Sequence, residues 1–123
     1  MPYLIQKSAD GSPVNYWNLH SGPISVGRGE KVDARIDDKE MSRQHFRVSR
    51  EDDAYVLEDL GSHNGTLVNG KRVEKATLQP DDKIRAGKSY FVFVEGLSTV
   101  IGKLEKEGRR YSTYVRKLSR KKS

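Results

Sequence analysis

Short runs of alternating apolar and polar residues, separated by turn residues, extend from residue 3 to about residue 95. Apolar residues at every second position are typical of strands that bury one face, as in Phe46-Arg47-Val48-Ser49. Many such short strands favour an all-β fold, an antiparallel sandwich or barrel. The predicted strands are Tyr3–Gln6, Val14–Leu19, Ile24–Gly27, Ala34–Ile36, Gln44–Ser49, Tyr55–Asp59, Thr66–Asn69, Arg72–Val73, Lys83–Ala86 and Ser89–Val94.

The pattern changes at the end of this region. Tyr90–Val94 is apolar on both faces, so its second face must also be covered. After Gly96 the apolar residues recur every three or four positions, which predicts an amphipathic helix whose first turns cover that face. The expected organisation is a β-sandwich over residues 1–96, a helical extension over 97–117 and a basic disordered tail over 118–123.

Charge is concentrated in the C-terminal part of the chain. The whole chain carries a net charge of +6, but residues 103–123 alone contain nine Lys or Arg and two Glu. A basic extension of this kind can bind nucleic acid or an acidic partner, or can simply be solvated. The sandwich region is close to neutral, so its function does not follow from net charge.

Composition excludes several classes of function. The chain has no cysteine, which rules out thiol catalysis and thiolate metal sites, and His20, His45 and His63 are too scattered to predict a zinc site. No cofactor motif is present. No apolar run reaches the roughly 20 residues that span a bilayer, and the start lacks a signal-peptide core. We therefore expect a cytoplasmic protein without a membrane span.

Three groups of residues carry candidate chemistry: Gly27-Arg28, Ser42-Arg43-Gln44-His45, and the stretch from Ser62 to Gly70. Each has a purely structural explanation, and Asn64-Gly65 is by itself a strong hairpin signal. However, a hairpin of residues 44–49 with 54–59 would bring the second and third groups to one end of a sheet. Guanidinium, hydroxyl and amide groups without a nucleophile and base pair suit binding of a doubly charged anion with three oxygens, without catalysis. Whether Arg28 joins them is left open, because the short strand Ala34–Ile36 permits this without requiring it.

The three groups, in this order and spacing, resemble the forkhead-associated (FHA) domain family. The likeness extends from about Ile24 to Val94 and consists of Gly27-Arg28, Ser42-Arg43-x-His45 and Ser62-x-Asn64-Gly65-Thr66-x-x-Asn69-Gly70. The resemblance implies a β-sandwich of about eleven strands. It also implies that the loops bind phosphothreonine in partner proteins, in signalling by Ser/Thr kinases.

The resemblance assigns a role to each matching position. Arg28 would hold the phosphate, Ser42 would bond a phosphate oxygen through its hydroxyl, and Arg43 would add a phosphate contact. Asn64 would grip the peptide backbone, and His63 stands where many members have a Thr or Ser that contacts the phosphopeptide. The positions expected to support the loops are Gly27, His45, Gly65, Thr66, Asn69 and Gly70.

Other hypotheses remain beside this one. The basic extension could be the working part, binding nucleic acid or an acidic partner with the sandwich as scaffold. Thr113, if phosphorylated, could dock in its own domain. Asp37, Asp38 and Glu40 favour a basic or polar residue after the phosphothreonine. An enzyme is not expected, because no nucleophile elbow is present; the oligomeric state does not follow from the sequence.

Overall fold

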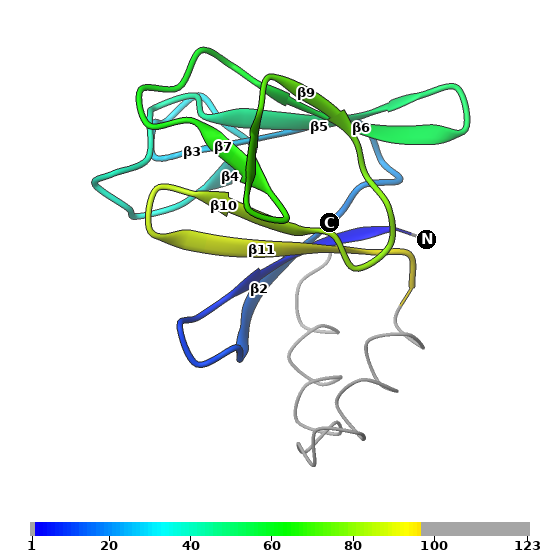
Figure 1. Cartoon of the computed structure of the whole chain (residues 1–123), viewed down its shortest axis with the longest axis horizontal. Helices are drawn as coiled ribbons and strands as arrows, with labels where there is room; N and C mark the ends of the chain where they lie inside the picture. The colour runs from blue at the N-terminus through cyan, green and yellow to red at the C-terminus, as the bar shows by residue number, and fades with distance from the viewer. Residues whose placement is uncertain (1, 97–123) are drawn as a thin grey trace.

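The computed structural model describes residues 2–96, which form eleven strands and no helix (Figure 1). Within this range, no segment could therefore cross a membrane as a helix. The all-β fold expected from the sequence is confirmed. The strands are β1 Tyr3–Lys7, β2 Pro13–Asn18, β3 Ile24–Gly27, β4 Ala34–Arg35, β5 Phe46–Glu51, β6 Ala54–Asp59, β7 Thr66–Val68, β8 Lys71–Val73, β9 Lys75–Thr77, β10 Lys83–Ala86 and β11 Ser89–Val94.

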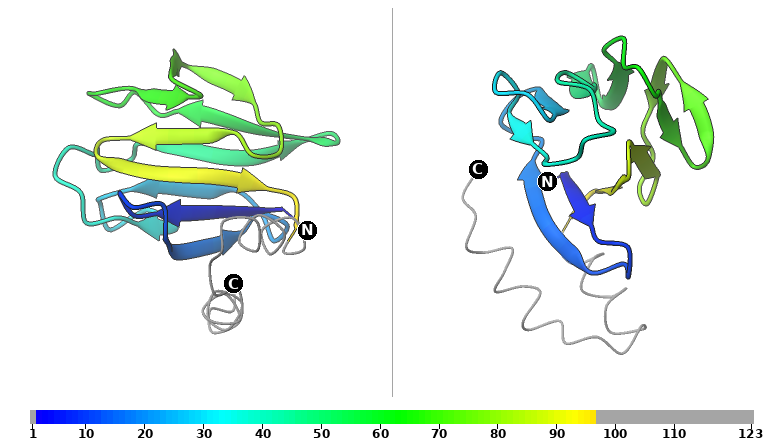
Figure 2. Two further views of the ribbon diagram at one scale, coloured as in Figure 1. Left: turned by 60° about the horizontal axis from the view of Figure 1, so that its bottom comes forward. Right: turned by 90° about the vertical axis from the view of Figure 1, so that its left-hand side faces the viewer.

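The strands form two sheets that pack face to face (Figure 2). One has six strands in the order β2-β1-β11-β10-β7-β8, and the other has five in the order β4-β3-β5-β6-β9. Apolar side chains from both sheets interdigitate between them, with the rings of Phe46 on β5 and Phe91 on β11 5.4 Å apart. This core fixes the two sheets against each other, so the loops at their ends are held in defined positions.

Strand β4 explains how the loops come together. It is only two residues long and runs parallel to β3, with Val26 opposite Ala34 and Gly27 opposite Arg35. Parallel strands end at the same edge, so the chain leaves β4 at the edge where β3 ended. Because β5 is antiparallel to β3 with Phe46 opposite Val26, it begins at that edge as well. Figure 1 shows these connections gathered at the left end of the molecule.

The predicted hairpin of residues 44–49 with 54–59 is present as β5 and β6, which pair from Phe46↔Asp59 to Glu51↔Ala54. The end of β6 therefore lies at the edge where β5 begins. Strand β9 was missed by the sequence prediction, because its three residues include one apolar side chain, Ala76. Its place is decided by pairing with β6, not by its own periodicity.

The two Asn-Gly pairs have different structures. Asn69 and Gly70 both have positive φ, at 51° and 83°, and form the tight turn of the β7–β8 hairpin. Asn64-Gly65 is not a hairpin turn, because β6 and β7, which flank it, belong to different sheets. Here only Gly65 has positive φ, at 84°. The pair forms part of a crossover loop at the edge of the sandwich.

Strand β11 has apolar residues on both faces, as predicted. Phe91 and Phe93 face the core, and Val92 and Val94 form a second buried cluster with Ile5 and Tyr16. The predicted helical extension, the basic tail and Thr113 lie outside the described residues.

Candidate functional site

Three loops meet at one edge of the sandwich. They follow β3, precede β5 and connect β6 to β7. The Arg28 backbone N–H donates to the Ser42 carbonyl oxygen at 3.1 Å. The His63 backbone N–H donates to Ser42 Oγ at 3.0 Å. Ser42 thus joins the first loop to the third, and the three groups singled out in the sequence form a single cluster.

Glycine at position 27 allows the first two loops to approach this closely. A Cβ atom built on Gly27 would lie 2.1 Å from the Arg43 carbonyl oxygen, and one on Gly29 would lie 3.0 Å from the same atom. Contacts as short as the first do not occur between real atoms, so a side chain at position 27 would push the loops apart. The Gly29 N–H donates to that carbonyl oxygen at 3.1 Å, which completes the junction.

The Arg28 side chain is anchored at one end and free at the other. Its Nε donates to the Met41 carbonyl oxygen at 2.7 Å, which leaves the two terminal nitrogens of the guanidinium to face a ligand. Among the described residues, no carboxylate lies within 4.0 Å of Arg28 or Arg43. Both guanidinium groups line an open groove of about 690 Å³, together with Gly29, Glu30, Lys31 and Gln44. Three cationic side chains against one carboxylate give the lining of this groove a net positive charge.

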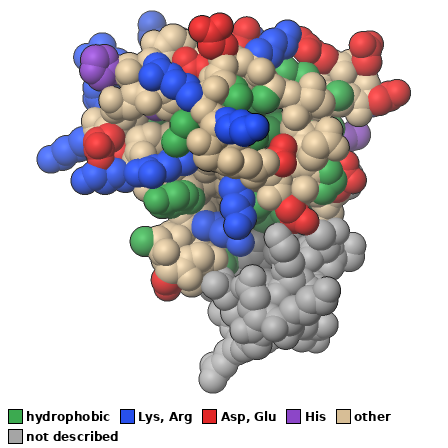
Figure 3. Space-filling model, in the orientation of Figure 1, with side chains coloured by type: hydrophobic (Ala, Val, Ile, Leu, Met, Phe, Trp, Pro, Cys, Tyr) green, Lys and Arg blue, Asp and Glu red, His purple; other side chains and the backbone are tan. Residues whose placement is uncertain are grey.

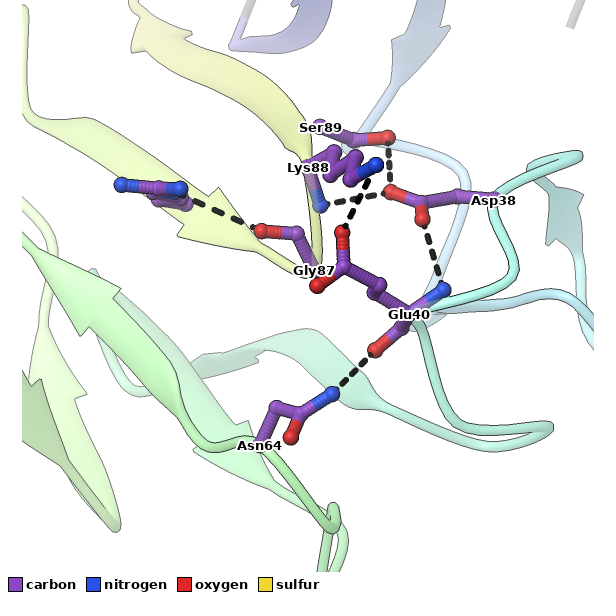
Figure 4. A network of polar contacts seen from close by, with 7 residues as sticks. Asp38, Glu40, Asn64, Gly87, Lys88 and Ser89 are labelled. Carbon is purple, nitrogen blue, oxygen red and sulfur yellow. Dashed lines mark hydrogen bonds and ion pairs between the residues drawn. The ribbon is translucent and has the colours of Figure 1, made fainter.

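Ser42, next to Arg43 in the chain, and Asn64, which lines a second cleft with Glu40, supply polar groups of known orientation. Because Ser42 Oγ accepts the His63 N–H, the serine hydroxyl is held in place while its own hydrogen has no acceptor among the described residues. Asn64 Nδ2 donates to the Glu40 carbonyl oxygen at 2.7 Å, as Figure 4 shows. This contact fixes the amide plane and leaves Oδ1 able to accept a hydrogen bond.

His45 holds the second and third loops together from beneath. Its side chain is fully buried. Nδ1 accepts the Ser42 backbone N–H at 3.0 Å, so the proton of the ring must be on Nε2, which donates to the Gly65 carbonyl oxygen at 2.8 Å. Both ring nitrogens are therefore hydrogen-bonded to backbone atoms of these two loops.

Asp59, at the end of β6, organises the third loop and was not identified from the sequence. Its carboxylate accepts hydrogen bonds from the N–H groups of Gly61 and Ser62 and from the hydroxyls of Ser62 and Thr66. Partial burial raises the pKa of Asp59, but the hydrogen bonds outweigh burial and hold the pKa below its ordinary value of 3.8. The signal that could have found it is local, since Asp with Gly two positions later, as in Asp59-Leu60-Gly61, is typical of an Asx-turn.

Asp38 connects the second loop to the β10–β11 turn. Its Oδ2 accepts hydrogen bonds from the Lys88 backbone N–H at 2.8 Å and from the Ser89 hydroxyl at 2.7 Å. Its Oδ1 accepts the Glu40 backbone N–H at 2.9 Å (Figure 4). Burial raises the pKa of Asp38, but the hydrogen bonds from Ser89, Glu40 and Lys88 together lower it by more. The pKa of Asp38 therefore lies below its ordinary value of 3.8. Both carboxylate oxygens of Asp38 thus already accept hydrogen bonds from within the domain. The Glu40 carboxylate forms an ion pair with Lys88 at 3.3 Å. Of the three acidic residues expected to select a partner residue, these two already have partners.

The remaining predicted residues divide between two places. The Arg43 and His63 side chains are exposed at the cluster, and Thr66 lies buried behind it through its bond to Asp59. Asn69 and Gly70 lie at the opposite end of β7. There, Asn69 contacts Asp82 and Lys83 beside the β7–β8 hairpin.

Solved structures of FHA domains have the same fold as this chain. The FhaA FHA domain, complexed with an intracellular domain, has a TM-score of 0.67 and 30% identity, covering 76% of this chain and 99% of that one. EmbR of Mycobacterium tuberculosis, in complex with a low-affinity phosphopeptide, has the same score and identity, but the match covers only 24% of its chain. A structure from an analysis of phosphothreonine-dependent FHA domain interactions has a TM-score of 0.66 and 28% identity, covering 77% of this chain and 96% of that one.

Curated relatives include an enzyme inhibitor and a regulator. The oxoglutarate dehydrogenase inhibitor of Corynebacterium diphtheriae is 36% identical over 72 residues, which is 58% of this chain and 50% of that protein. The glycogen accumulation regulator GarA of Mycobacterium tuberculosis is 38% identical over 78 residues, which is 63% of this chain and 48% of GarA. The chain therefore spans about half the length of these relatives. The FHA domain family model matches residues 24–87, more than half of the chain, and with the loop cluster in place this chain belongs to the FHA domain family.

Proposed function

We propose that this chain is a phosphothreonine-dependent binding module that recognises phosphorylated partner proteins in signalling by Ser/Thr kinases. The observation that carries the proposal is the pair of guanidinium groups, Arg28 and Arg43, that share one groove without a described carboxylate counterion. A phosphorylated side chain has a charge of about −1.5 to −2 at neutral pH and three acceptor oxygens. The groove supplies the opposite charge and donors of matching geometry.

The proposed roles follow from the contacts of each side chain. Arg28 holds the phosphate, because its Nε bond to Met41 fixes the side chain and leaves both terminal nitrogens of the guanidinium able to donate. Arg43 adds a second cation, and the free hydrogen of the Ser42 hydroxyl donates to a phosphate oxygen. Asn64 accepts a peptide N–H through Oδ1, since its Nδ2 is already bound to Glu40. The exposed His63 side chain lies next to Ser42 and contacts the peptide near its phosphate.

The known relatives support this reading. One matching structure is part of a study of phosphothreonine-dependent FHA interactions, and EmbR is bound to a phosphopeptide. The chain matches both over about three quarters of its length. A phosphorylated partner must be reached by a kinase that uses ATP, which is why we place the function in the cytoplasm.

The proposed activity is binding without catalysis. Ser42 and His45 are the pair that would have to act as nucleophile and base. His45 Nδ1, however, accepts the backbone N–H of Ser42, not its hydroxyl, and Nε2 is directed to Gly65. No ring nitrogen is left to take a proton from Ser42 Oγ. The site is therefore suited to hold a phosphate ester and not to hydrolyse it.

Binding of matched peptides tests the proposal. Phosphothreonine, phosphoserine and unphosphorylated versions of a peptide library are titrated against the chain by fluorescence anisotropy. We expect a dissociation constant on the order of micromolar for phosphothreonine peptides, weaker binding of phosphoserine and none without phosphate.

Variants separate the site from the rest of the surface. Arg28→Ala and Ser42→Ala remove hydrogen bonds to a charged group, so each weakens binding by about tenfold or more. Arg50→Ala is the matched control, because Arg50 is exposed at the far end of β5 and pairs with Asp53. Thermal melting of each variant verifies that it is folded. Unchanged affinity of Arg28→Ala would refute the assignment.

A further inference from the structure

The outer face of the six-stranded sheet carries a continuous row of side chains. Strand register places Arg72 of β8 opposite Leu67 of β7, Leu67 opposite Arg85 of β10, and Arg85 opposite Tyr90 of β11. These positions alternate with core residues such as Ile84 and Phe91, so all four face away from the core. We call these four residues the basic row. It crosses four neighbouring strands of one sheet.

The basic row is exposed and its cations are not neutralised. Tyr90 is the one large apolar side chain in the described residues that is strongly exposed, at 42%. The Arg85 guanidinium lies over its ring, 5.4 Å from the centroid, which is within the range of a cation–π contact. Neither Arg72 nor Arg85 has a described carboxylate within 4.0 Å. By contrast, Arg47, Arg50, Lys75 and Lys88 each have one.

The positive charge here is a local feature. Residues 1–102 contain 14 Lys or Arg against 15 Asp or Glu, so the sandwich as a whole is nearly neutral. Lys83, on the same face of β10 as Arg85, is also exposed and unpaired among the described residues. Figure 3 shows Lys and Arg side chains over the left and centre of the view, and Asp and Glu mainly along the upper and right-hand edges. On this face of the described part, basic and acidic side chains are thus partly separated.

The basic row is continuous with the loop cluster. A cleft of about 220 Å³ is lined both by Asn64 and Gly65 of the loop cluster and by Leu67 and Arg85 of the row, together with Glu40 and Gly87. Asn64 is the residue proposed to hold the peptide backbone. A chain bound at Asn64 can therefore pass directly onto the outer face of the sheet.

We infer that the basic row binds a short acidic segment of the same partner protein whose phosphothreonine occupies the loop cluster; this inference rests on the proposed function. Tyrosine and arginine are the residue types that most often carry binding energy at protein interfaces, and Leu67 supplies apolar contact between the two arginines. Charge complementarity selects Asp or Glu in the segment. Strands lie about 4.8 Å apart, so the row is roughly 15 Å long. An extended segment of about five residues has this length.

The experiment compares peptides that differ only in this segment. Phosphothreonine peptides carry five Asp or Glu residues directly before or directly after the phosphothreonine, and the controls carry Asn or Gln at the same positions. Unphosphorylated versions of all four are included. Affinity is measured with the full chain at low and at raised salt. The acidic segment on one side is expected to tighten binding by about three- to tenfold at low salt, and the gain shrinks as salt screens the exposed charges.

A double variant assigns the gain to the basic row. Arg72→Gln with Arg85→Gln removes both charges and keeps much of each side chain, and the acidic and neutral peptides then bind equally. Arg47→Gln with Arg50→Gln, on the other sheet, is the matched control and retains the gain. Because every variant keeps residues 97–123, any attraction of the peptide to the basic C-terminal segment is the same throughout and cancels.

The outcomes separate this inference from the proposed function. If neutral phosphothreonine peptides do not bind, the proposed function fails; an unphosphorylated acidic peptide whose binding depends on Arg72 and Arg85 would then still support the row. If neutral phosphothreonine peptides bind but neither acidic segment tightens binding, or the gain survives in the double variant, the inference is overturned. Tighter binding of a single-stranded oligonucleotide than of the acidic peptides, through the same two arginines, would overturn it as well.

Discussion

His45 Nε2 donates a hydrogen bond of 2.8 Å to the Gly65 carbonyl oxygen, 20 residues further along the chain. The other ring nitrogen accepts the backbone N–H of Ser42. One buried side chain thus sets the distance between the loop that bears Ser42 and the loop that bears Asn64. A site that binds a phosphate in a fixed orientation requires such rigidity, because the donors must be in place before the ligand arrives.

Replacement of His45 by alanine tests this support. His45→Ala leaves the Ser42 N–H and the Gly65 carbonyl oxygen buried without their partner and creates a cavity. We expect the free energy of unfolding to fall by about 2–4 kcal/mol, measured by urea denaturation. His63→Ala is the control, since His63 is exposed, and it should change stability by less than about 0.5 kcal/mol. Equal stability of the two variants would contradict the role given to His45.

The approach of the first two loops depends on Gly27. In Gly27→Ala, the new Cβ would meet the Arg43 carbonyl oxygen at 2.1 Å, so the loops must separate. We expect a loss of at least about 2 kcal/mol of unfolding free energy and a marked loss of phosphopeptide binding. Gly96→Ala has no atom within 4 Å of the added methyl group and should melt like the wild type. A Gly27→Ala protein with wild-type stability would show that the loops can adjust.

The lowered pKa of Asp59 predicts a pH-dependent contribution to stability. A carboxyl group whose pKa is lower in the folded state stabilises the fold at pH values above its ordinary pKa of 3.8. This contribution is lost as the pH falls through the folded-state pKa. Asp59→Asn should therefore cost about 1–2 kcal/mol at pH 7. The stability difference between wild type and variant should shrink below about pH 3.8.

Urea denaturation between pH 7 and pH 2.5 measures this effect. Asp53→Asn provides the control, because the Asp53 side chain is fully exposed at the β5–β6 turn. A difference between wild type and Asp59→Asn that stays constant over the whole pH range would argue that the hydrogen bonds to Asp59 do not depend on its charge.

Asp38 should link the β10–β11 turn to the affinity of the site. Asp38→Ala removes the acceptor of three hydrogen bonds and frees the loop whose Glu40 carbonyl oxygen holds Asn64. We expect a loss of about 1–3 kcal/mol of stability and phosphopeptide binding weakened several-fold. Asp37→Ala, at the exposed neighbouring position, should have neither effect. Calorimetric titration of both variants measures the difference, and unaltered affinity in Asp38→Ala would separate this network from binding.

The sequence by itself determined the features that depend on neighbouring residues. Alternation along Phe46–Glu51 and Ala54–Asp59 indicated a hairpin, and Asn69-Gly70 carried the signal of the turn that joins β7 to β8. The motifs were sufficient to identify the family, because the spacing of the loop residues can be recognised in the sequence without knowing how the loops are arranged in space.

Tertiary structure decided the relationships between distant segments. Arg28 lies beside Ser42 because β4 runs parallel to β3, a direction that two residues with no periodicity cannot specify. Asn64-Gly65, with the same letters as the hairpin turn, became a crossover because β6 and β7 pair in different sheets. Asp38 accepts hydrogen bonds from Lys88 and Ser89, which are 50 and 51 residues further along the chain, so its role depends on the folded structure. Strand direction and sheet membership depend on the packing of the whole core, and no local pattern of side chains records them.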